Sequence, residues 1–419
     1  MLGIMTAAAL AAGLQGGGAV EHWRFALDVR GEGETERVEL PFEVDLDTTT
    51  GRATIRNGEE RIAVPEAHRD AAAFTLDFPH YDSRLELHRV ESDTAFETFE
   101  GTWTKTRGAG ATSVVPVRAV LGPTHRFEPV EGLSVGADAV AGRWRVAFSS
   151  SDVPAVGVFE SDGSTGVTGT FLTDTGDYRY LAGDVSRRTC ASRASTARTP
   201  SGSRPTRRVP ASSPAASSAA APGGRRAGAR CATTTRHSPT RRHDFGLREV
   251  SLVEHLAFPD ADGAWRPLWN VDRPLVVELF GSWCPNCHDA AVLLEELHRE
   301  HGESVDVVGL AFELTGDFAR DAEQVRRFRE ARGVTYPLLI GGTADKGRAA
   351  QALGITDTVL AFPTTIVLDR NGHVVRVYSG FSGPATGAAY VRVREILEDA
   401  VRRRSPCRAR VSADSSSRT

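Results

Sequence analysis

Two cysteines separated by two residues carry the chemistry that the sequence indicates most directly. Cys284 and Cys287 enclose Pro285 and Asn286 and follow Trp283. Thiols at this spacing are close enough to form a reversible Cys284–Cys287 disulfide. Because the thiolate is the form that attacks a disulfide, one of the two cysteines needs a lowered pKa. The motif therefore favours thiol–disulfide exchange.

A buried strand and an amphipathic helix are predicted on either side of this motif. Residues 274–280 are apolar and β-branched and lie between Pro and Gly, as in a buried strand. Residues 289–301 have helical periodicity, which would place Cys284 at a helix N-terminus, where backbone N–H groups and the helix dipole favour an anion. The expected apolar face is Ala290, Leu293, Leu294 and Leu297, with Glu295, Glu296, Arg299 and Glu300 largely off it.

The motif resembles the active site of thioredoxin-fold proteins, and most closely that of the TlpA-like thiol-disulfide oxidoreductases. The resemblance rests on residues 283–287 (Trp-Cys-Pro-Asn-Cys) and on residues 362–365 (Phe-Pro-Thr-Thr), which look like the cis-proline loop of the family. It extends from about 274 to about 401 and includes the Asn371-Gly372 hairpin signal. The resemblance implies an α/β thioredoxin-like fold and a dithiol-disulfide activity.

The same resemblance implies roles for the residues around the two cysteines. Cys284 would attack a partner disulfide, and Cys287 would resolve the mixed disulfide. Pro363, in cis, would bring the backbone of Phe362 beside the sulfurs, where it can pair with a substrate strand and where a metal ligand cannot approach. Trp283 would shield the thiolate and pack against the partner. The expected substrate-binding residues are Phe362, Pro363, Pro285 and Asn286.

Glu278 is the candidate base. It lies six residues before Cys284 on the predicted strand, at the position that matches the buried acid of thioredoxin. Burial raises the pKa of a carboxyl group, which suits a base that accepts the Cys287 proton near neutrality. The alternative is that Glu278 faces a polar rim and only packs. TlpA-like reductases of cytochrome maturation often carry a glutamate three residues after the second cysteine, and Ala290 occupies that position here.

Two alternatives for the cysteine motif involve a bound group. Residues 284–288 also match the Cys-x-x-Cys-His pattern of c-type haem attachment. A haem site needs a loop and an apolar pocket, whereas this motif lies between a strand and its helix, and the only methionines are Met1 and Met5. A structural zinc site would need a second ligand pair at short spacing. We therefore expect no metal and no cofactor, and we expect His288 to add positive potential or to be solvated.

Length and composition place few limits on the partners. The 419 residues predict two or three domains, and the net charge of −4 gives no indication of a nucleic-acid partner. The five cysteines do not form a disulfide framework. The chain is rich in Arg but has only two lysines, Lys105 and Lys346.

Residues 21–185 are predicted to be all-β, as a barrel or a sandwich. Short, often alternating apolar segments are separated by turn signals such as Asn57-Gly58 and Asp162-Gly163. Residues 101–104 and 169–172 look alike, which suggests a weak internal repeat. The histidines of this segment are too scattered for metal ligation, and its tryptophans suit a core better than a ligand platform.

Residues 186–243 change character abruptly. They contain no Asp, Glu, Leu, Ile, Phe, Trp or Tyr, so they cannot bury a core and are predicted to be disordered. A basic linker, an Arg-rich nucleic-acid-binding segment and a frameshift in GC-rich DNA are three explanations, of which we favour the frameshift. Reading the gene in the neighbouring frames tests it, because strands should reappear there. The tail 403–419 has the same composition, so Cys190, Cys231 and Cys407 receive no role.

The first residues suggest export. Residues 2–14 form a short apolar run, which has the length of a signal-peptide core but lacks a preceding Lys or Arg. The run is too short to span a bilayer, so a membrane association would come only through this leader, residues 1–20. TlpA-like proteins usually work outside the cytoplasm, and the resemblance therefore implies a periplasmic or extracytoplasmic location.

The sequence thus predicts a multidomain protein. An all-β domain at 21–185 and an α/β thioredoxin-like domain at 244–402 would be joined by the tract 186–243. The expected function is thiol-disulfide exchange with protein disulfide or dithiol partners, with the chain as the reductant, although the sequence leaves the direction open. The alternative is a binding module whose β-domain recognises an envelope ligand while the thioredoxin-like domain is redox-inactive.

Overall fold

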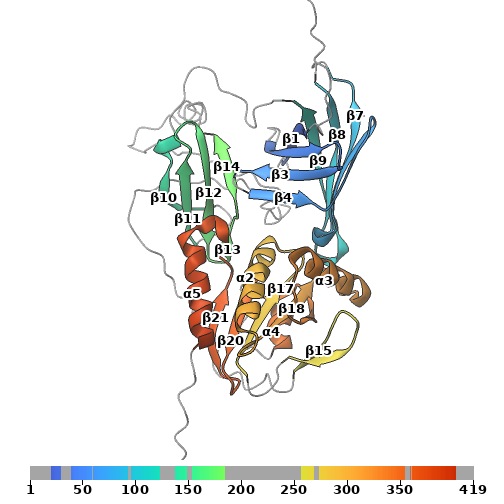
Figure 1. The fold of residues 1–419 in the computed structure, drawn as a ribbon. Coiled ribbons are helices and arrows are strands. Elements are labelled where there is room, and N and C mark those ends of the chain that lie inside the picture. The colour runs from blue at the N-terminus through green and yellow to red at the C-terminus, as the bar shows by residue number, and fades with distance from the viewer. Residues whose placement is uncertain are drawn as a thin grey trace, which may run out of the picture.

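The computed structural model describes residues 20–29, 39–58, 60–92, 96–122, 137–148, 153–184, 256–268, 273–353, 359 and 361–402. Within them it has two β-sheets in the N-terminal half and a thioredoxin-like α/β domain in the C-terminal half (Figure 1). The predicted fold class, an all-β part followed by an α/β part, is confirmed. The predictions for the leader, for the tract 186–243, for the tail and for Cys190, Cys231 and Cys407 fall outside the described residues.

The larger sheet contains nine antiparallel strands in the order β4-β3-β2-β1-β9-β8-β7-β6-β5. Chain neighbours pair from β1 to β4 and from β5 to β9, and β1 also pairs with β9, so β4 and β5 are the two edge strands of this order. Its strands are β1 (Val20–Asp28), β2 (Glu39–Asp47), β3 (Arg52–Asn57), β4 (Glu60–Val64), β5 (Glu66–Arg69), β6 (Ala73–Phe78), β7 (Ser83–Val90), β8 (Thr98–Thr106) and β9 (Thr112–Leu121).

This sheet curls into a near-barrel. β4 lies against β6 and β3 lies against β5, which brings the two edges together. Alternate residues point inward and fill the interior, as the alternating sequence pattern predicts. Trp23, Phe74 and Phe99 pack edge to face at its centre, with ring centroids 5.1–6.0 Å apart. A short helix, η1 (Pro79–Tyr81), connects β6 to β7.

The smaller sheet has its own core. A short helix, η3 (Ala137–Ala139), precedes its first strand, and Phe159 and Phe171 pack in the centre at 5.4 Å. β12 pairs with β11 along one edge and with both β13 and β14 along the other. The resembling segments 101–104 and 169–172 therefore lie on different sheets. The strands are β10 (Gly142–Val146), β11 (Ala155–Ser161), β12 (Gly166–Thr173), β13 (Gly176–Asp177) and β14 (Leu181–Asp184).

The C-terminal domain is built on a mixed sheet in the order β19-β18-β17-β20-β21. β17 and β18 are parallel, and β20 and β21 form an antiparallel hairpin beside β17. Gly372 has φ +76°, as the Asn371-Gly372 turn requires. The strands are β17 (Leu275–Phe280), β18 (Asp306–Glu313), β19 (Leu338–Thr343), β20 (Thr364–Leu368) and β21 (Val374–Ser379), and the hairpin β15 (Ala257–Pro259) and β16 (Trp265–Pro267) precedes them.

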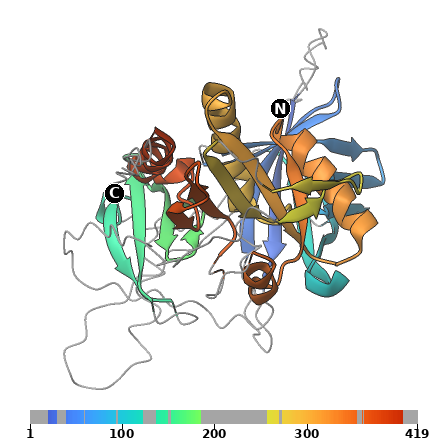
Figure 2. The same cartoon turned by 90° about the horizontal axis from the view of Figure 1, so that it is seen from below.

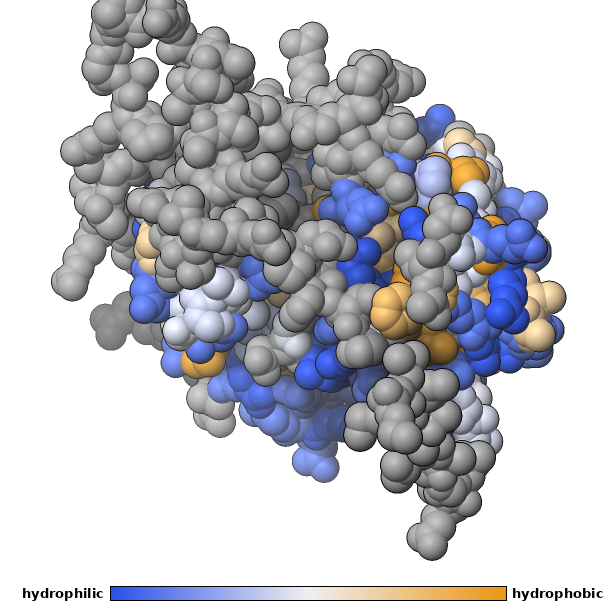
Figure 3. All heavy atoms as spheres, turned by 90° about the horizontal axis from the view of Figure 1, so that it is seen from above, coloured by the Kyte–Doolittle hydropathy of each residue, from blue (hydrophilic) through white to orange (hydrophobic). Residues whose placement is uncertain are grey.

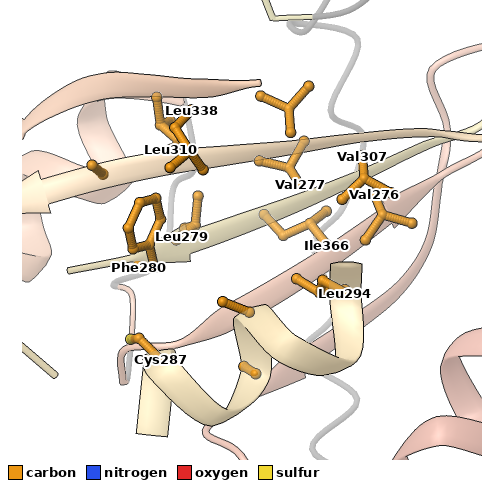
Figure 4. Close-up of a cluster of buried hydrophobic side chains, with 14 of the residues drawn as sticks. Val276, Val277, Leu279, Phe280, Cys287, Leu294, Val307, Leu310, Leu338 and Ile366 are labelled. Atoms are coloured by element: carbon orange, nitrogen blue, oxygen red, sulfur yellow. The ribbon is translucent and has the colours of Figure 1, made fainter. Parts of the chain in front are cut away.

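Four helices and a short η6 (Pro384–Thr386) pack around this sheet. Asp317 and Asp345 cap two of them by accepting hydrogen bonds from backbone N–H groups of the first turn. Leu294 and Cys287 point from α2 toward Val276, Leu279 and the rest of the sheet (Figure 4). The helices are α2 (Pro285–His301), α3 (Phe318–Arg332), α4 (Lys346–Ala352) and α5 (Ala388–Arg402).

Both β-sheets lie against the C-terminal domain. The near-barrel contacts α3 through η1, and the smaller sheet contacts η6 beside α5 (Figure 1, Figure 2). Seen from the β-rich side, the coloured surface is mainly hydrophilic with scattered hydrophobic residues (Figure 3). None of the described helices is both long and apolar enough to cross a membrane.

Candidate active site

The paired cysteines lie where β17 ends and α2 begins. Cys284 is the N-cap residue, with extended backbone, and Pro285 is the first residue of the helix. The backbone N–H of Cys287 donates to the carbonyl of Cys284 at 3.1 Å, which closes the first turn. Cys284 is 8% exposed and Cys287 is fully buried, and both are free thiols. The strand-to-helix position therefore makes Cys284 the outer thiol of the pair.

The surroundings of the two thiols shift their pKa values in opposite directions. A hydrogen bond with the Cys287 side chain lowers the pKa of Cys284, and the backbone N–H groups of Cys287 and Asn286 act in the same direction against burial. Burial and the neighbouring Cys284 charge raise the pKa of Cys287 well above its usual value. The pair thus has one nucleophile and one thiol that keeps its proton until a base removes it.

The predicted proline loop faces Cys284. The Phe362–Pro363 peptide bond is cis. The thiol of Cys284 donates to the carbonyl oxygen of Phe362 at 3.4 Å. The carbonyl of Pro363 accepts from the N–H of Gly380 at 2.8 Å, so the loop is held against the end of β21. Sulfur and loop backbone therefore meet although 78 residues separate Cys284 from Phe362.

Glu278 is completely buried on β17. The hydroxyl of Tyr336 is 3.5 Å from its Oε2, and its Oε1 has no hydrogen-bond partner among the described residues. Burial, followed by the charge of Cys284, raises the pKa of Glu278 well above its usual value. A charge on Glu278 also contributes to the raised pKa of Cys287.

Trp283 lies half-buried beside the loop. Its Nε1 donates to the carbonyl of Phe312 at 3.0 Å, and its ring packs edge to face on Phe362 at 5.8 Å. Trp283 thus connects β18 to the proline loop.

Glu313 is a site residue that the sequence reasoning missed. It ends β18, is 2% exposed, and accepts from the backbone N–H and the hydroxyl of Ser282 at 2.8 and 2.6 Å. Burial raises the pKa of Glu313 to about 7 despite these bonds. An acidic residue at the end of a continuous apolar strand was the available signal.

His288 corrects an expectation from the sequence. It is fully buried rather than solvated, and its Nε2 donates to the carbonyl of Ser282 at 2.7 Å while its Nδ1 accepts from Arg332. Burial, with Arg332 next, lowers the pKa of His288 well below its usual value, so the ring is neutral and adds no positive charge. Tyr81 of the near-barrel packs on this ring at 4.3 Å.

Glu295 corrects a second expectation. The sequence predicts that it lies off the apolar face of its helix, but it is 5% exposed and accepts from the N–H and the hydroxyl of Thr335, both at 2.7 Å. Helical periodicity could not anticipate this burial, because the partner comes from the segment after α3.

A turn of the smaller sheet contacts the residues between the two cysteines. The main-chain N–H of Asp177 donates to Phe381 at 3.1 Å, and its side chain accepts from the N–H of Gly383 at 2.7 Å. The side chain of Asn286 donates to the carbonyl of Asp177 at 3.1 Å. Asn286, expected to contact a substrate, thus contacts the chain's own β-rich half.

Arg179 fastens the same turn. Its backbone has φ +54°, in the left-handed region that costs a non-glycine residue about 1–2 kcal/mol. Its guanidinium donates to the carbonyl of Pro285 at 3.3 Å and pairs with Glu60 at 2.7 Å and Asp289 at 3.2 Å. One side chain therefore joins the near-barrel, the smaller sheet and α2.

The fold and this geometry define a thioredoxin-like domain with a paired-cysteine site. Residues 270–391 match the Redoxin family model, which places a Redoxin domain in the C-terminal part of the chain. A search of curated proteins found no match.

Solved structures that resemble part of the chain have low identity to it. StoA from Bacillus subtilis is 17% identical over 34% of this chain and 95% of its own, with TM-score 0.26. A secreted Mycobacterium tuberculosis disulfide oxidoreductase homologous to E. coli DsbE is 16% identical over 35% and 93%, with TM-score 0.26. A DsbF homologue from Corynebacterium diphtheriae is 22% identical over 40% and 99%, with TM-score 0.29.

Proposed function

We propose that this protein is a thiol-disulfide oxidoreductase that exchanges electrons with disulfides of partner proteins through Cys284 and Cys287. The observation that carries the proposal is the position of the Cys284 sulfur. It lies at the N-terminus of α2, beside the thiol of Cys287 and the carbonyl of Phe362 in the proline loop. A thiol in this setting ionises readily and faces backbone that can pair with an extended substrate.

The exchange proceeds in two balanced steps. The Cys284 thiolate attacks one sulfur of the partner disulfide, so that a Cys284–partner bond forms and the other partner sulfur leaves as a thiolate. Cys287 then loses its proton and attacks the Cys284 sulfur. The Cys284–Cys287 disulfide forms, the second partner sulfur leaves, and two electrons have passed to the partner.

Glu278 is the proposed acceptor of the Cys287 proton. Its buried carboxyl has a high proton affinity when it is ionised. The charge on Cys284 contributes to that raised pKa and disappears once Cys284 is in the mixed disulfide, which favours ionisation of Glu278 at the step that needs a base.

Insulin reduction coupled to a dithiol donor tests the function. The wild type should reduce insulin, Cys284→Ser should be inactive, and Cys287→Ser should accumulate a mixed disulfide that mass spectrometry detects. Glu278→Gln should slow release of that intermediate by about 10²-fold, within the usual range for a lost general base. Cys407→Ser is the matched cysteine control. A wild type without dithiol-dependent activity would exclude the proposal.

The direction and the subgroup are finer proposals. We propose that the chain acts as a reductant, which a glutathione titration tests: the dithiol should be oxidised at potentials below that of the glutathione pool. We also propose that residues 274–401 are TlpA-like, on the basis of the motif and the proline loop. We propose an extracytoplasmic location mainly because TlpA-like proteins usually work outside the cytoplasm, with the apolar run 2–14 as a second argument, and cell fractionation tests it. The binding-module alternative is not favoured, because both cysteines and the proline loop are in place.

A further inference from the structure

Lys105 is a buried cation that the thiol chemistry described above does not use. It lies on β8 of the near-barrel and is 6% exposed. Within the part of the chain that the structure describes, no carboxylate forms a salt bridge with Lys105, and Asp82 nearby is paired with Arg320. Its ammonium is 5.5 Å from the centroid of the Tyr81 ring. A buried ammonium needs a compensating anion, because leaving it unpaired costs several kcal/mol.

The cavity next to Lys105 leads to the first residue of α2. Lys105 lines a cavity of about 50 Å³ together with Tyr81 and Pro285, and Pro285 directly follows Cys284. On its other side Lys105 borders a groove of about 880 Å³ between the near-barrel and α3. Lys105 therefore lies at the interface where the near-barrel faces the helix N-terminus that carries the thiol.

Cys284 and Asp82 are the two anions that raise the pKa of Lys105, and Asp82 is already paired with Arg320. The groove beside Lys105 is also lined by the carboxylates of Glu66, Asp77, Glu323 and Glu330. From α2 and β17, burial raises the pKa values of Cys287 and Glu278, so both groups resist ionisation. From the near-barrel, Arg107 is a second cation. His80, which lines the groove, has a pKa lowered by burial to about 4 and is neutral.

Lys105 and Cys284 influence each other electrostatically. Burial lowers the pKa of Lys105 to about 8, and a charge on Cys284 acts in the opposite direction. Lys105 in turn lowers the pKa of Cys284. At pH 7 the lysine is mainly protonated, so it presents a positive charge to the thiol whose pKa it lowers.

We propose that Lys105, supplied by the β-rich half of the chain, is the counter-ion of the Cys284 thiolate and sets its reactivity. The inference rests on the proposed function for its biological meaning, but the thiolate can be measured without any partner. When Cys284 attacks a disulfide its negative charge moves to the leaving sulfur, and Lys105 neither gains nor loses an electron. Lys105 therefore stabilises the reduced, ionised form of the dithiol relative to the disulfide.

Alkylation of Cys284 by iodoacetamide as a function of pH tests this pairing. The rate constant for the Cys284 peptide is followed by mass spectrometry in the full-length protein. In the Lys105→Met variant Cys284 should react about tenfold more slowly at pH 6.5, and the midpoint of the pH–rate profile should move to higher pH. Lys105→Arg should retain the wild-type midpoint because it keeps the charge. Lys346→Met, which removes the other lysine of the chain on an exposed turn of α4, should leave the profile unchanged.

The shape of the profile separates charge from structure. A purely structural role would change the plateau rate at high pH, which reports access, and would leave the midpoint in place. Should Lys105→Met not fold, Lys105→Gln carries the same expectation with a polar side chain of similar length. An unchanged midpoint in a folded Met or Gln variant overturns the inference. Insulin reduction could fail in the wild type while the Lys105 variants still move the midpoint of the pH–rate profile. In that case the proposed function is wrong, but the inference that Lys105 is the counter-ion of Cys284 stands.

Discussion

Glu313 supports the turn that carries the cysteines. Its carboxyl group binds both the N–H and the hydroxyl of Ser282, two residues before Cys284. Each bond favours the ionised carboxyl, but complete burial outweighs them and raises the pKa of Glu313 to about 7. A group that is half-protonated near neutrality therefore adjoins the strand-to-helix junction.

This raised pKa predicts a pH dependence of stability. A carboxyl whose pKa is higher in the folded state stabilises the fold fully below its unfolded pKa of about 4.5, and this contribution is lost as the pH rises through about 7. The free energy of unfolding of Glu313→Gln relative to the wild type should therefore rise by roughly 3 kcal/mol between pH 4.5 and pH 8. Urea denaturation at several pH values measures it, with the exposed Glu303→Gln as control. A difference that does not vary with pH would contradict the expectation.

At the scale of elements, the turn after β12 joins the two halves of the chain. β13 and β14 pair with the same edge of β12, and residues 178–180 bulge out between them. This bulge lets Arg179 reach the carbonyl of Pro285 and the carboxylates of Glu60 and Asp289. Burial raises the pKa of both carboxyl groups, and Arg179 acts in the opposite direction. In the same turn the main-chain N–H of Asp177 donates to the carbonyl of Phe381, which directly follows the Gly380 that bonds to the proline loop.

Removal of the Arg179 charge should loosen this cover. Arg179→Met keeps much of the volume but leaves Glu60 and Asp289 without their cation, which should cost about 3–5 kcal/mol. We expect a higher plateau rate of Cys284 alkylation at high pH, because the turn no longer shields the motif, together with a lower unfolding temperature. Arg143→Met on exposed β10 is the control. An unchanged alkylation plateau would show that the turn does not limit access.

At the scale of the whole molecule, the described residues form three separate hydrophobic cores. The near-barrel, the smaller sheet and the α/β domain each enclose their own hydrophobic cluster. Their contacts with one another include polar bonds such as those of Arg179, Asp177 and Asp82. We propose that residues 21–185 and 244–402 are separate domains that fold on different cores.

Calorimetry tests this division. Because polar contacts couple the cores less strongly than a shared hydrophobic core would, we expect more than one thermal transition. Arg179→Met should separate the transitions further, whereas Arg143→Met should not. A single transition whose van't Hoff and calorimetric enthalpies agree would mean that the cores unfold as one unit.

Local patterns determined much of the C-terminal domain. The apolar run before Cys284, the helical periodicity after it and the Asn371-Gly372 turn predict β17, α2 and the β20–β21 hairpin. These features can be predicted from the sequence because strand and helix periodicities and turn preferences act over a few residues. The dithiol and the proline loop could be named for the same reason, with the family resemblance as a guide.

Only the tertiary structure decided what surrounds the dithiol. Lys105 and Arg179 come from sheets more than a hundred residues away, and 106 residues separate Arg179 from Pro285. A charged residue on an alternating strand looks like a surface residue in the sequence, whereas Lys105 lies on the buried face of β8 together with Trp103. The division of the β-rich half into two cores was hidden for the same reason, since strand patterns do not reveal which strands pair. Burial and long-range pairing are properties of the assembled chain, and they determine which charges act on the sulfur.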